Sequence, residues 1–88
     1  MRKGFTKAER ATLEEKIGNV DSAIDLLTEF MRERHVLAEE WMGERSEAWF
    51  ETEKCEEFEA WVNELDFKID EIEQLKDEIS IDALEEII

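Results

Sequence analysis

The chain contains no proline and no tyrosine, and only three of its 88 residues are glycine. A β-rich fold needs many turns built from glycine and proline, so their scarcity indicates an all-α protein. The single cysteine, Cys55, excludes an intrachain disulfide and falls where an apolar core or interface residue is expected. A run of about 18 apolar residues and the apolar segment of a signal peptide are also missing. We therefore expect a soluble, cytoplasmic protein of one small domain.

Residues that could perform chemistry are equally scarce. His35 is the only histidine, and no local motif joins it to Cys55 as a nucleophile and base. A di-iron bundle needs Glu-x-x-His, but the residue three before His35 is Arg32. The chain also lacks a calcium-binding loop, a Cys-x-x-Cys pair and a glycine-rich phosphate loop. We predict a protein that is not an enzyme and has no catalytic, cofactor or metal site.

Basic residues are rare in one part of the chain only. Residues 1–36 carry seven basic and seven acidic side chains, whereas residues 37–88 carry four basic and nineteen acidic ones, which account for the whole net charge of −15. Such a charge attracts basic surfaces and repels nucleic acid and anionic lipid, so neither is an expected direct partner. Because solubility needs a net charge of only about 2–8, the excess indicates a binding function.

The helix signals predict a hairpin. Thr6 and Glu9 fit a capping box, so a first helix is expected over about 6–42. Gly43 can adopt the left-handed conformation that ends a helix, which gives a turn at 43–45. Ser46 can cap a second helix over about 46–79. In the tail, residues 80–88, Ser80 or Asp82 can cap a further short helix. The alternative is one continuous helix through Gly43.

Each predicted helix carries an apolar stripe at spacings of three and four residues, typical of helices that pack together. The first comprises Leu13, Ile17, Val20, Ile24, Leu27 and Met31; the second comprises Cys55, Phe58, Val62, Leu65, Ile69 and Ile72, with Lys76 at the next apolar position. A lone hairpin cannot cover these stripes fully. We expect a homodimer in which the hairpins form a four-helix bundle with helices crossing at roughly 20°. The alternative is that a different helical protein packs on these apolar stripes.

Around the predicted turn the chain resembles the WXG family of type VII secretion substrates. Trp41 and Gly43 match its Trp-x-Gly motif, and Trp49 follows at a suitable position. The resemblance implies a small dimeric helical hairpin that is secreted. The family's Tyr-x-x-x-Asp/Glu export signal is missing, because the chain has no tyrosine. A purely physical alternative is a tryptophan that packs over a helix end closed by glycine.

The charge predicts mimicry of nucleic acid. Nineteen carboxylates on a straight helix would extend over roughly 78 Å, about one per 4 Å, and a dimer doubles their number. B-form DNA carries one charge per about 1.7 Å, so a basic nucleic-acid-binding surface of a larger protein could accept this chain. In charge and size it resembles small phage-borne inhibitors of host defence, including some anti-CRISPR proteins. The residues expected to bind are Glu47, Glu51, Glu53, Glu56, Glu57, Glu59 and Glu64, with Trp49 and Trp61 as anchors. A WXG-type secretion or dimerisation module and a coiled-coil adaptor or structural protein remain the alternatives.

Overall fold

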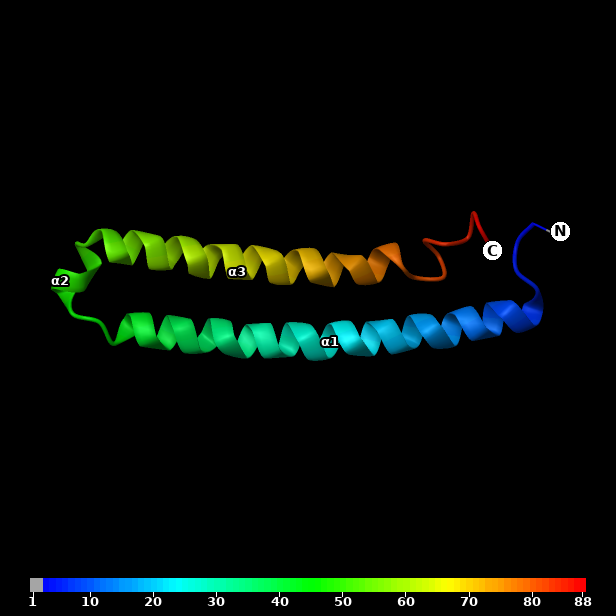
Figure 1. The fold of residues 1–88 in the computed structure, drawn as a ribbon, viewed down its shortest axis with the longest axis horizontal. Helices are drawn as coiled ribbons and strands as arrows, with labels where there is room; N and C mark the ends of the chain where they lie inside the picture. The colour runs from blue at the N-terminus through cyan, green and yellow to red at the C-terminus, as the bar shows by residue number, and fades with distance from the viewer. Residues whose placement is uncertain (1–2) are drawn as a thin grey trace.

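The computed structural model describes residues 3–88 and is an antiparallel helical hairpin (Figure 1). Helix α1 spans Lys7–Gly43, the short α2 spans Glu47–Phe50, and α3 spans Glu53–Glu78. The two long helices lie side by side and give a rod of 67 × 19 × 16 Å. No strand occurs within the described range. The all-α prediction is therefore confirmed, and a continuous helix through Gly43 is excluded.

Helix α1 begins at the predicted capping box. The Thr6 backbone N–H donates to Glu9 Oε1 at 3.0 Å, and the Glu9 N–H donates to Thr6 Oγ1 at 3.1 Å. Hydrogen bonds with Thr6 lower the pKa of Glu9. The bond with the Thr6 backbone has the larger effect, and the bond with its side chain has the smaller one. Two amides that no helical carbonyl can reach are thereby satisfied.

Replacing the cap tests this start. Thr6→Ala is expected to lower the free energy of unfolding by about 1 kcal/mol, because the Glu9 amide loses its acceptor. Urea titration followed by circular dichroism measures the change. Thr12→Ala is the matched control, since the Thr12 hydroxyl only bonds back to the Ala8 carbonyl within the helix. Equal losses in the two variants would contradict a capping role.

The core lies where α1 and α3 meet. Its buried members within the described residues are Ile24, Thr28, Ala38, Cys55, Val62 and Ile69. The predicted stripe of α3 is confirmed, because Phe58, Leu65 and Ile72 are half-buried between these positions. On α1, Ile24 is buried and Leu13, Ile17 and Met31 are half-buried, also as predicted.

Two residues of the predicted α1 stripe are not covered within the hairpin. Val20 and Leu27 remain 46% and 48% exposed, and the positions facing α3 are taken by the following residues, Asp21 and Thr28. Thr28 can be buried because its hydroxyl donates to the Ile24 carbonyl at 3.0 Å.

Polar pairs accompany this register. The Lys76 ammonium bonds to the Asp25 carboxylate, which raises the pKa of Lys76, and the charge of Asp21 acts in the same direction. A second pair, Arg32 with Glu73, also joins α1 to α3. Both cations therefore meet carboxylates across the helix interface.

The turn differs from the prediction in two ways. Gly43 is the last residue of α1, and Glu44 after it has φ −88°, so the predicted left-handed Gly43 is wrong. Ser46 does act as a cap, but it caps only the four-residue α2, accepting the Trp49 N–H at 3.4 Å. A second break follows at Thr52, whose hydroxyl donates back to the Trp49 carbonyl at 2.6 Å. The predicted single helix over 46–79 is thus divided in two.

The tail folds back on the start of the chain instead of forming a helix. Residues 79–87 make successive turns, in which Ser80 Oγ accepts the Ala83 N–H at 3.2 Å. The Phe5 N–H donates to the Ile88 carbonyl at 2.8 Å. Gly4 has φ +83°, and a Cβ there would lie 2.6 Å from the Ile88 oxygen, so this contact requires glycine. The two ends therefore lie together (Figure 1).

Candidate partner-binding surfaces

Aromatic side chains form a cluster at the turn. The rings of Trp41 and Trp49 have centroids 5.3 Å apart, those of Trp41 and Phe58 lie 4.8 Å apart, and Phe58 and Trp61 are separated by 5.8 Å. The Arg45 guanidinium lies 4.2 Å above Trp41, and its Nε donates to the Trp41 carbonyl. The cluster holds the end of α1 against the start of α3.

The two predicted anchors differ in their surroundings. Trp49 is half-buried inside this cluster, in contact with Phe50 and Phe58 as well as Trp41. Trp61 is 43% exposed, and the guanidinium of Arg34 lies 5.0 Å from its ring centroid. Only Trp61 therefore presents a large part of its side chain to a partner.

All seven predicted glutamates are exposed, but they do not lie on one surface. Glu47 belongs to α2 and Glu51 to the break after it, whereas the other five are on α3. Glu57 and Glu64 are seven residues apart, so they lie on the same side of α3. Glu71 and Glu78 continue that spacing, which extends the surface beyond the predicted residues. We call these four residues the glutamate row.

One cation lies beside the glutamate row. Lys68 Nζ is 3.1 Å from Glu71 Oε2 and 3.8 Å from Glu64 Oε1. The hydrogen bond to Glu71 and then its charge raise the pKa of Lys68. These side chains are between 46% and 64% exposed, so the pairs contribute little to stability and leave the carboxylates accessible to other cations.

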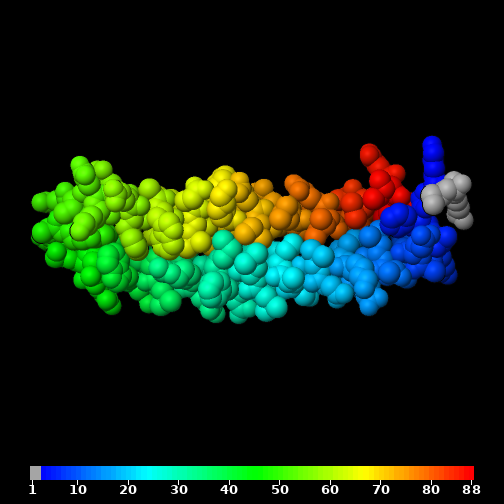
Figure 2. All heavy atoms as spheres, in the orientation of Figure 1, coloured from blue at the N-terminus to red at the C-terminus, as the bar shows by residue number. Residues whose placement is uncertain are grey.

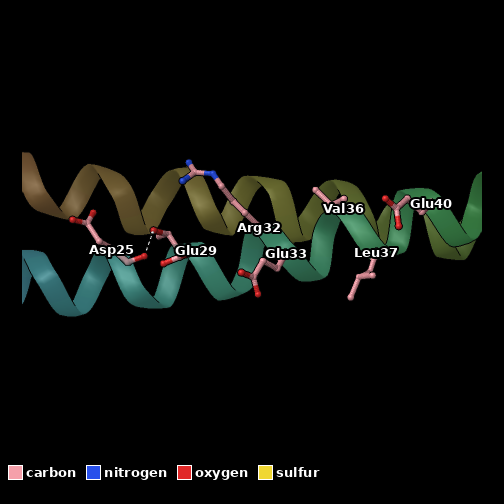
Figure 3. A pocket seen from close by; sticks show the side chains of 8 residues that line it. Asp25, Glu29, Arg32, Glu33, Val36, Leu37 and Glu40 are labelled. Atoms are coloured by element: carbon pink, nitrogen blue, oxygen red, sulfur yellow. Dashed lines mark hydrogen bonds between the residues drawn. The ribbon is translucent and has the colours of Figure 1, made fainter.

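A second acidic surface lies on α1 and was missed from the sequence. A groove of about 650 Å³ has Val36 and Leu37 among its apolar lining, and its charged residues are four carboxylates and one cation, Arg32. The carboxylates are Asp25, which also pairs with Lys76, and Glu29, Glu33 and Glu40. Figure 3 shows these side chains projecting from one helix. Asp25, Glu29 and Glu33 recur every four residues, which is the signal that could have identified them. A count over residues 1–36 conceals them, because basic residues balance the sum.

The two long helices form one rod (Figure 2), so the acidic residues of both helices lie along it. The chain has 26 acidic residues and a net charge of −15, and the rod is 67 Å long, so there is about one carboxylate per 2.6 Å and one net negative charge per about 4.5 Å, compared with one charge per about 1.7 Å of B-form DNA. The carboxylate density exceeds the one per about 4 Å expected for a straight helix. Folding back therefore increases the resemblance in charge density.

The two residues considered for chemistry lie at the helix interface. His35 is half-buried, with Nδ1 3.0 Å from Glu39 Oε1. Cys55 is buried, and this burial, followed by the charge of Glu59, raises the pKa of its thiol. A raised pKa disfavours the thiolate, which is the reactive form. Among residues 3–88, no three His, Cys, Asp or Glu side chains are grouped to hold a metal ion.

The helices and the sequence were also compared with what is known of membrane-spanning helices and of other proteins. No helix in the described part of the chain combines the length and apolar character needed to cross a bilayer. Comparison of the chain with known protein families, curated proteins and solved structures finds no match.

Proposed function

We propose that this protein is a non-enzymatic acidic binding protein that inhibits a larger nucleic-acid-binding protein by occupying its basic surface. The observation that carries the proposal is the density of exposed carboxylates along the 67 Å rod, on both long helices. Arginine and lysine side chains that normally hold phosphates can pair with such carboxylates. Occupation of these cations then excludes DNA or RNA without any chemical step, as in a phage-borne inhibitor of host defence.

The two acidic surfaces have complementary roles in this proposal. The glutamate row supplies charge along α3, where Glu57 and Glu64 are exposed. The groove on α1 adds apolar contact through Val36 and Leu37 beside its carboxylates. Contacts of the first kind weaken in salt, whereas apolar contacts do not. The proposal includes the homodimer, because a second copy doubles the number of carboxylates available.

Reversing the glutamate row tests the proposal. The variant Glu57→Lys, Glu64→Lys, Glu71→Lys and Glu78→Lys is expected to capture at least tenfold less nucleic-acid-binding protein from a bacterial lysate than the unmodified chain. The reason is that four attractive contacts become repulsive. Captured proteins are eluted first with duplex DNA and then with a salt step, and are quantified by mass spectrometry.

A matched variant controls for net charge. Glu14→Lys, Glu15→Lys, Glu85→Lys and Glu86→Lys makes the same change in charge away from the glutamate row, and should capture as well as the unmodified chain. Equal capture by the row variant would overturn the proposal. Retention of only the protein itself, or of one small helical partner through high salt, would instead favour the WXG-type or adaptor alternatives.

A further inference from the structure

The hairpin exposes more surface than a compact chain of its mass. Its accessible surface is 7064 Å², whereas a compact monomer of 10.5 kDa exposes about 5,400 Å². Its radius of gyration is 20.1 Å, compared with about 12 Å for a compact chain of this length. The excess area, about 1,700 Å² per chain, is about twice the roughly 800 Å² that one side of a stable protein interface buries.

Part of this surface is an apolar row on α1 that lies beside the side packed on α3, with Trp41 at its end also contacting Phe58 of α3. Val20, Leu27 and Trp41 are spaced at multiples of seven, with Arg34 at the remaining position, so the four residues follow one side of the helix. Phe30 lies beside them, three residues after Leu27. The four apolar side chains are between 39% and 67% exposed. They form a second stripe next to the one that packs on α3.

A matching row follows α3. Lys54, Trp61, Lys68 and Leu75 are each seven residues apart, and Trp61 and Leu75 are 43% and 45% exposed. The two rows meet on the same side of the hairpin, since the Arg34 guanidinium lies 5.0 Å from the Trp61 ring centroid. Together with Phe30 they form what we call the apolar face.

The geometry points to the apolar face as the interface with a second copy of this chain. The assignment rests on the homodimer included in the proposed function, but it does not depend on the basic partner. The six apolar side chains of the face expose on the order of 550 Å² per copy, and the cations between them extend the area toward the roughly 800 Å² that one side of a stable interface buries.

Charge identifies the occupant as a second copy. The two rows contain no carboxylate and three cations, Arg34, Lys54 and Lys68, in a chain whose net charge is −15. Glu64 and Glu71 border these rows and pair with Lys68. A second copy carries the same apolar rows and the same bordering carboxylates, so it can cover the apolar side chains and place carboxylates beside the cations.

The same charges set the orientation. The glutamate row borders the α3 side of the apolar face through Glu64 and Glu71, which flank Lys68. Packing α3 against α3 of the second copy would bring two glutamate rows together. Packing α1 of each copy against α3 of the other avoids this, and places all neighbouring helices antiparallel.

Mass in solution tests the assignment. Sedimentation equilibrium of the full chain at micromolar concentration should give the mass of two chains, and Leu27→Glu should give that of one, because the carboxylate would be buried in the interface. Val36→Glu is the matched control: it places the same charge at an exposed apolar position of α1 that lines the groove instead of the apolar face, and should remain a dimer.

A milder variant covers the case in which Leu27→Glu unfolds the hairpin, which circular dichroism would reveal. Phe30→Gln adds no charge at a position that is 67% exposed, and should raise the dimer dissociation constant at least tenfold. A single-chain mass for the unmodified protein, or dissociation by Val36→Glu with Phe30→Gln unaffected, would overturn the assignment. Neither readout involves the basic partner, so failure of the lysate experiment would not be confused with failure here.

Discussion

Ile69→Ala is expected to lower the free energy of unfolding by about 3 kcal/mol. Ile69 is only 2% exposed and lies at the interface of α1 and α3, so the substitution removes buried methyl groups and leaves a cavity. The loss is a large fraction of the stability that a core of this size supplies. Urea titration at a fixed protein concentration measures it, because the stability of a dimer depends on concentration.

A larger truncation two residues away provides the control. Phe67 is 54% exposed, and Phe67→Ala is expected to change the free energy of unfolding by less than about 0.5 kcal/mol. Equal losses for the two variants would mean that α3 packs with another face toward α1, which would refute the described register.

The register of α3 could be predicted from the sequence, whereas that of α1 could not. The apolar residues of α3 that recur at spacings of three and four define one dominant stripe, so Val62 and Ile69 are buried as predicted. Helix α1 has apolar residues on two adjacent sides, and periodicity alone cannot decide which side faces α3. The side that faces α3 is shown only by long-range packing, which buries Ile24, Thr28 and Ala38.

The candidate binding surfaces show a similar division. The exposed glutamates of α3 could be identified from the sequence, because that part of the chain has few basic residues. The groove carboxylates of α1, including Glu29 and Glu33, could not be found by counting charge. An acidic surface on a helix depends on which side of the helix each charged residue occupies, and a sum over the segment does not contain this information. The break at Thr52 was also hidden, because neither glycine nor proline marks it.

The two halves of the Trp-x-Gly motif can be separated by mutation. Trp41→Ala is expected to lower the free energy of unfolding by about 2 kcal/mol, because Trp41 contacts Trp49 and Phe58 and supports Arg45. Near-UV circular dichroism should lose the signal of the packed tryptophans, and urea titration measures the stability.

Gly43→Ala is expected to be neutral or to stabilise the protein by about 0.5 kcal/mol, in contrast to Trp41→Ala. Gly43 has helical backbone geometry, and a Cβ there would meet no atom within 4 Å, so nothing in the turn requires glycine. A WXG-type module would need both residues for pairing or export, and losses of similar size in the two variants would support that alternative. Loss in Trp41→Ala alone would show that the aromatic cluster stabilises this turn and that the glycine is dispensable for folding.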